Sequence, residues 1–69
     1  MGTRTILVLA AKNIVGKRAL FDFTEQRRLL AHWATSMGLG KRAAEQFADK
    51  WLPSPEFTSL LERFASFGQ

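Results

Sequence analysis

The stretch Thr3-Arg4-Thr5-Ile6-Leu7-Val8-Leu9-Ala10-Ala11 decides how this chain is interpreted, because residues 6–11 form its longest unbroken apolar run. β-Branched and long aliphatic side chains in such a run are typical of a strand, and alternation would make both of its faces apolar. An edge strand with two apolar faces needs a cover on each side, which a second copy of the protein would supply. We therefore predict an N-terminal strand and a homodimer whose interface is formed by Ile6, Leu7, Val8 and Leu9.

A second extended stretch, residues 18–23, places Ala19, Phe21 and Phe23 on one face, and Gly16 marks a turn before it. Together with the first stretch it suggests a β-hairpin. The alternative, in which residues 18–23 begin a helical segment, stays open at this point.

The rest of the chain predicts three helices, because its apolar residues recur at spacings of three and four. The first helix is capped by Thr24 and ends at the turn glycine Gly38, the second begins at Lys41 and ends before Pro53, and the third is opened by Ser54-Pro55-Glu56. The predicted fold class is α+β, mostly α, with an N-terminal β-strand or hairpin followed by a helix-turn-helix-like three-helix unit. All of it forms one domain, residues 1–69.

Size and charge narrow the function classes. A chain of 69 residues hides only about 60% of the surface that its unfolded form exposes, and without cysteine it has no disulfide to compensate, so oligomerisation is the remaining route to stability. Its formal charge of +4 favours an acidic partner surface or nucleic acid. Because the apolar run is too short to span a bilayer or serve as a signal-peptide core, we expect a cytoplasmic protein without membrane contact.

No set of residues matches an enzymatic or metal site. The one histidine, His32, has Ser36 one turn away but no third residue to orient its ring. Glu45 and Asp49 lie one turn apart on a polar helix face, with no sign of the buried pocket that a catalytic pair of carboxylates needs. One histidine without cysteine cannot form an ordinary zinc site. We predict a protein that is not an enzyme and has no catalytic residue, metal or cofactor.

Residues 30–47 resemble a DNA-binding helix-turn-helix, since Ala34, Gly38 and Leu39 fall where that motif has its small residue, turn glycine and core contact. Ala44 is smaller than the branched residue usual at its position. An ordinary helical hairpin has the same pattern, and acidic residues on the second helix disfavour a phosphate backbone. If the motif is real, the side chains that reach base edges are Lys41, Arg42, Glu45 and Gln46.

Arg27 and Arg28 form a basic pair outside the main apolar stripe of their helix. Guanidinium groups bind carboxylates in a bidentate geometry, so these two residues are candidates for contacts with acidic groups of a partner.

Length, basic character and the order strand, helix, glycine turn, helix and Ser-Pro-capped helix resemble the small phage-encoded quorum-sensing anti-activators. The resemblance is carried by Thr3-Arg4-Thr5-Ile6-Leu7-Val8, Arg27-Arg28 and Ser54-Pro55-Glu56. It implies a small dimeric protein that binds a host quorum-sensing transcription activator and stops it from acting on DNA, with a pilus-assembly ATPase as a second host partner. The alternative is a dimeric helix-turn-helix DNA-binding regulator.

Overall fold

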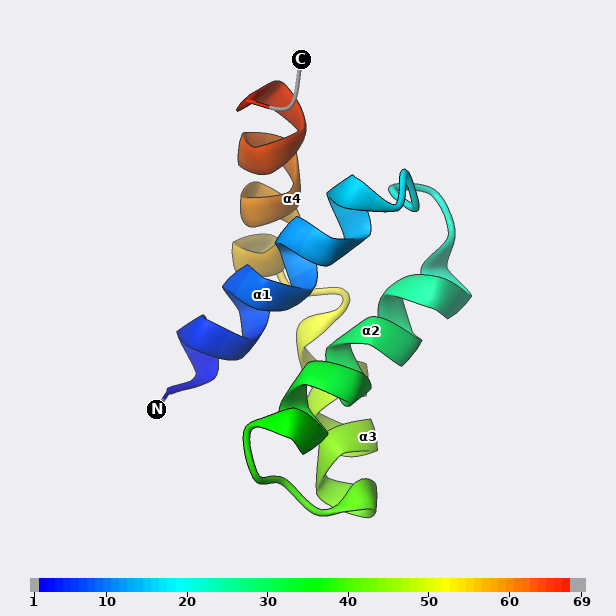
Figure 1. Ribbon diagram of the computed structural model, residues 1–69, viewed down its shortest axis with the longest axis vertical. Coiled ribbons are helices and arrows are strands. Elements are labelled where there is room, and N and C mark those ends of the chain that lie inside the picture. The colour runs from blue at the N-terminus through cyan, green and yellow to red at the C-terminus, as the bar shows by residue number, and fades with distance from the viewer. Residues whose placement is uncertain (1, 68–69) are drawn as a thin grey trace.

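The computed structural model describes residues 2–67, apart from the side chain of Phe67. Within this range the chain forms four helices and no strand: α1 (Thr3–Gly16), α2 (Phe23–Ser36), α3 (Lys41–Trp51) and α4 (Pro55–Phe67). Figure 1 shows α1 between α4 and α2, with α3 packed against α2. The predicted α+β class, in which a strand or hairpin precedes a three-helix unit, is therefore wrong. None of the four helices in residues 2–67 has the length and apolar character needed to cross a membrane.

The N-terminal stretch is a helix because its buried residues follow a spacing of three and four. A continuous apolar run fits a strand and a buried helix equally well, so residues 6–11 alone do not separate the two. The pattern continues past the polar residues Lys12 and Asn13 to Ile14, which only the helical period explains. The buried face of α1 consists of Ile6, Leu7, Ala10, Ala11 and Ile14.

Residues 17–22 connect α1 to α2 and form no second strand, so the predicted hairpin is wrong as well. The Arg18 amide donates to the Val15 carbonyl and the Ala19 amide to the Ile14 carbonyl, each at 3.0 Å. This pair of hydrogen bonds is the Schellman arrangement, which requires a left-handed residue. Arg18 takes that position with φ of 58°, and Gly16, the expected turn residue, is the last residue of α1.

Arg18→Gly is expected to stabilise the protein by about 0.5–1 kcal/mol, because a side chain in the left-handed region costs more than the extra freedom that glycine has in the unfolded chain. Urea unfolding measures the change. Arg18→Ala removes the same charge but keeps a side chain at this φ, so it is the matched control and should give no comparable gain. Equal effects of the two substitutions would contradict the conformational explanation.

The predicted starts of the later helices are largely correct. Asp22, one turn before Glu25, caps α2 in place of Thr24, since the Glu25 amide donates to Asp22 Oδ1 at 3.0 Å. The start of α3 at Lys41 is confirmed, and Gly38 ends the preceding turn with φ of 109°. The capping role of Ser54 is also confirmed, because the Phe57 amide donates to Ser54 Oγ at 3.2 Å.

α1 is the centre of the molecule. Leu7 belongs to the larger core cluster with residues from all the other helices, including Phe57, whereas Ile6 packs with Ala34 and Ala44 in a smaller cluster. Ile6 and Leu7 are thus covered by the chain's own helices and offer no surface to a second copy. Of the predicted dimer interface only Val8 and Leu9 stay partly exposed. Homodimerisation itself stays a prediction.

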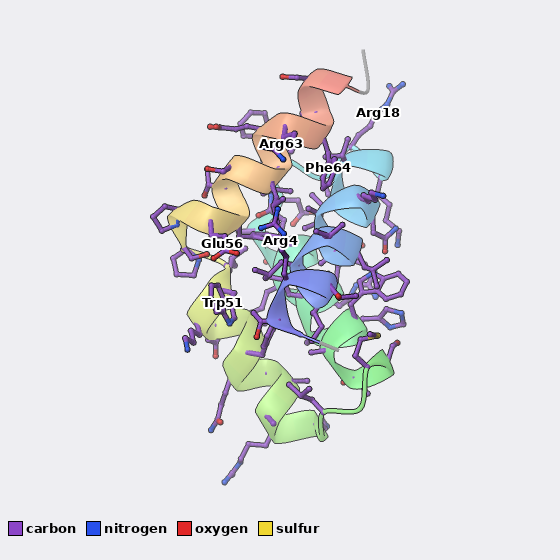
Figure 2. All side chains as sticks on the ribbon, turned by 90° about the vertical axis from the view of Figure 1, so that its left-hand side faces the viewer. Arg4, Arg18, Trp51, Glu56, Arg63 and Phe64 are labelled. Carbon is purple, nitrogen blue, oxygen red and sulfur yellow. The ribbon has the colours of Figure 1, made fainter. Side chains whose placement is uncertain are left out.

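Polar contacts also join α1 to α4. Arg4 and Glu56 form an ion pair with 3.6 Å between Nη1 and Oε2, and the ammonium group of Lys12 lies 5.6 Å from the centre of the Phe64 ring. Figure 2 shows Arg4 reaching across to α4. Because these groups are largely exposed, their contribution to stability is small beside that of the apolar core.

Candidate protein-binding site

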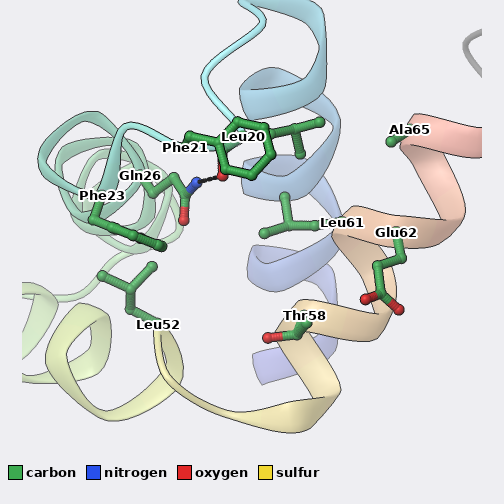
Figure 3. A pocket seen from close by; sticks show the side chains of 9 residues that line it. All are labelled: Leu20, Phe21, Phe23, Gln26, Leu52, Thr58, Leu61, Glu62 and Ala65. Atoms are coloured by element: carbon green, nitrogen blue, oxygen red, sulfur yellow. Dashed lines mark hydrogen bonds between the residues drawn. The ribbon is translucent and has the colours of Figure 1, made fainter.

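An apolar groove of about 430 Å³ opens where the α1–α2 connection and the start of α2 face α4. We call it the phenylalanine groove; Figure 3 shows the side chains that line it. Two parts of the sequence far from each other, residues 20–26 and 52–65, supply them, so the groove exists only in the folded chain. The lining residues are Leu20, Phe21, Phe23, Gln26, Leu52, Thr58, Leu61, Glu62 and Ala65.

Two phenylalanine rings at this groove are left uncovered. Phe21 is 92% exposed and Phe23 is 65% exposed, whereas Phe57 is completely buried. Burying a phenylalanine side chain is worth about 1.5–3 kcal/mol, and this fold leaves that free energy unused at both positions. A single exposed apolar residue is ordinary, but two neighbouring rings beside an apolar groove mark an interaction surface.

Gln26 shapes the groove from beneath. It is only 1% exposed, and its Nε2 group donates to the Ala19 carbonyl at 2.8 Å and the Leu20 carbonyl at 2.7 Å. These two hydrogen bonds attach the α1–α2 connection, which contains Phe21, to helix α2. Since buried backbone carbonyls need partners, the side chain of Gln26 holds this segment in a defined position.

Arg27 and Arg28, predicted to bind a partner, already bind carboxylates of their own chain. Arg27 donates to both oxygens of Asp49, at 2.7 and 3.3 Å, and so joins α2 to α3. Arg28 donates to both oxygens of Glu25, at 2.8 and 2.6 Å. These hydrogen bonds raise the pKa of each arginine. Both side chains are exposed, but the geometry does not support their presenting free guanidinium groups to a partner.

Glu25 has the most strongly shifted carboxyl group among the described residues. The Arg28 hydrogen bond and charge, with Lys17 at 3.6 Å, lower its pKa from the ordinary 4.5 to about 2. Hydrogen bonding to Arg27 lowers the pKa of Asp49 in the same way. Both groups bind protons more weakly in the folded chain than in the unfolded chain, so their contribution to stability is present above pH 4.5 and is lost as the pH falls.

Glu25→Gln is therefore expected to flatten the loss of stability between about pH 5 and pH 2, because an amide does not titrate. Urea unfolding at several pH values in this interval measures the slope. Arg28→Gln removes the principal partner and should flatten the same interval. A variant whose acid dependence parallels that of the unchanged protein would show that the ion pair is not formed in solution.

The four residues predicted for a recognition helix lie on α3, away from the phenylalanine groove. Lys41, Arg42 and Gln46 are exposed and Glu45 is partly exposed. Neither Lys41 nor Arg42 forms an ion pair within residues 2–67, whereas the charge of Glu45 acts on Arg27 and raises its pKa. The basic end of α3 is thus a second surface, separate from the groove.

The residues of the phenylalanine groove were not predicted as a binding site from the sequence. The predicted strand has Phe21 and Phe23 on one apolar face, a pattern that predicts burial and not exposure. The available signal for Phe21 was its position directly before Asp22, a residue type that caps helices, where it continues no helical stripe of apolar residues. No local pattern indicated that Gln26 is buried or that Glu62 lies at the groove.

Residues 2–67 bring together no group of three or more His, Asp or Glu side chains that could hold a metal ion. No protein-family model matches the chain, and comparisons with curated proteins and with solved structures found no match either.

Proposed function

We propose that this protein acts by binding another protein through the phenylalanine groove and thereby inhibits it. The observation that supports the proposal is the pair of exposed rings, Phe21 and Phe23, at an apolar groove of about 430 Å³. Aromatic side chains that insert between partners supply most of the free energy of many protein interfaces.

The targets to test first are those that the family resemblance implies. They are a host quorum-sensing transcription activator, whose binding to DNA would be blocked, and a pilus-assembly ATPase. Both place the interaction in the cytoplasm, in agreement with the short apolar run of the sequence.

Phe21→Ala is expected to weaken binding of the target at least about tenfold, as loss of an aromatic anchor does in other interfaces. The melting temperature should stay unchanged, because the Phe21 ring is 92% exposed. Calorimetric titration of the purified target measures the affinity, and Lys41→Ala, on the other surface, is the control. Equal affinities of Phe21→Ala and the unchanged protein for the target would count against the proposal. So would a pull-down from host lysate that recovers nucleic acid but no stoichiometric protein.

A second candidate function is DNA binding by α3. It is favoured by Lys41 and Arg42, which are exposed and engage no carboxylate among the described residues, at the start of a helix that follows a glycine turn. A protein that contacts phosphates loses affinity steeply as salt rises, and each lost contact lowers the slope by about one. Binding of duplex DNA at 50 and 200 mM salt, with Arg42→Ala as the test variant, decides the matter. A flat salt dependence excludes this function.

A further inference from the structure

We infer that the phenylalanine groove, if it is the binding site proposed above, takes a basic apolar segment of the partner in which an arginine lies among apolar residues. The first observation is charge. Glu62 is the one ionisable residue among those lining the groove, and it is exposed and joins no ion pair within the described residues. A lone carboxylate beside an apolar surface favours a cation and repels an acid.

The second observation is that the polar side chains of the groove present only hydrogen-bond acceptors. Both protons of Gln26 Nε2 are donated to backbone carbonyls, and the hydroxyl of Thr58 donates its proton to the Ser54 carbonyl at 3.2 Å. What remains are oxygen lone pairs on Gln26, Thr58 and Glu62. An occupant that brings donors satisfies these three side chains, whereas one that brings acceptors leaves them unpaired.

The side-chain oxygen of Gln26 is one of these hydrogen-bond acceptors. Gln26 Oε1 accepts no hydrogen bond from the described residues, and no enclosed side-chain nitrogen or oxygen among them lacks a partner. The atom therefore keeps a small exposed area although its residue is 99% covered, and Figure 3 shows it turned away from the bonded nitrogen, on the side of Phe23. A nearly buried side chain that lines the groove thus contributes an acceptor that has no partner among the described residues.

Arginine fits this combination best among the ordinary side chains. Its guanidinium group carries five donors and no acceptor, and it stacks on aromatic faces such as the exposed rings of Phe21 and Phe23. Its stem packs on apolar surface while the charged end meets a carboxylate. The groove therefore favours a basic segment of the partner, whereas the chain as a whole, with a formal charge of +4, favours an acidic surface.

Three capped peptides test the inference, each with two leucines on both sides of a central arginine, glutamine or glutamate. Binding is followed by NMR shifts of the groove residues. We expect the arginine peptide to bind at least about tenfold more tightly than the glutamate peptide, since a like charge beside Glu62 is unfavourable. Glu62→Gln should remove most of this preference. Glu56→Gln is the matched control, because it removes the same charge from the same helix but on the side that meets Arg4 (Figure 2). This variant should keep the preference for the arginine peptide.

The outcomes separate this inference from the proposed function. Equal binding of the three peptides, abolished by Phe21→Ala, would overturn the arginine preference and leave the groove as a protein-binding site. Peptide binding that Phe21→Ala does not weaken would overturn both. The inference would also be overturned if the arginine peptide did not bind at millimolar concentration. The same holds if the NMR shifts of the groove residues changed with protein concentration in the absence of peptide, because a second copy of the chain would then occupy the groove.

Discussion

Leu7→Asp is expected to abolish folding. Leu7 is completely buried in the core between α1 and the other helices, and no cation within the cluster could pair with a carboxylate there. Burying an unpaired charge costs several kcal/mol, and a domain of this size has a total stability of about 3–10 kcal/mol. Loss of the helical circular dichroism signal at neutral pH measures the effect.

Leu9→Asp is the matched control, because Leu9 is only partly buried. We expect this variant to stay folded, with a loss of about 1 kcal/mol or less. The pair also tests the secondary structure. In a strand, Leu7 and Leu9 would lie on the same face and tolerate aspartate equally, whereas in a helix they lie on nearly opposite sides. Equal effects of the two substitutions would therefore contradict α1.

Gln26→Glu has the second largest expected effect. It places a carboxylate where two backbone carbonyls, of Ala19 and Leu20, now accept hydrogen bonds at 2.8 and 2.7 Å. We expect a loss of about 4 kcal/mol at neutral pH, because both carbonyls lose their donor and face a negative charge. Burial raises the pKa of the introduced carboxyl above its unfolded value, so stability falls as the pH rises through the folded pKa and returns on acidification.

Urea unfolding of Gln26→Glu between pH 4 and pH 8 measures this dependence. Its direction is opposite to that expected from Glu25, whose lowered pKa removes stability as the pH falls. Gln26→Met keeps the size of the side chain without a donor or a charge, and should lose about 1–3 kcal/mol at every pH. A Gln26→Glu protein as stable at pH 7 as the unchanged one would show that Gln26 does not hold the α1–α2 connection.

The helices that the sequence predicted correctly are those whose ends depend on local chemistry. Ser54 caps α4 through a hydrogen bond to Phe57, three residues away, and Gly38 provides the positive φ that ends the α2 turn. Both effects act within one helical turn, so a short window of sequence contains them. The sequence predicts Thr24 as the cap of α2 although Asp22 forms it, because both residue types cap helices and they lie only two positions apart.

The candidate site was not predictable in the same way. The sequence predicts that Arg27 binds a partner, but the fold brings Asp49, 22 residues later, within 2.7 Å of it. The exposure of Phe21 and the burial of Gln26 depend equally on how the α1–α2 connection lies against α4. The acceptor character of the groove arises because the donors of Gln26 and Thr58 are used elsewhere in the fold.

Composition and local pattern were enough to predict one small basic chain with three C-terminal helical segments and the starts of the last two, because hydrogen bonding within a turn depends on neighbouring residues alone. The helical state of residues 6–11 and the open groove beside two phenylalanine rings depend instead on packing between segments distant in the sequence. An apolar run gains the same free energy by burial as a helix or as a strand, so the choice depends on the surfaces that pack against it.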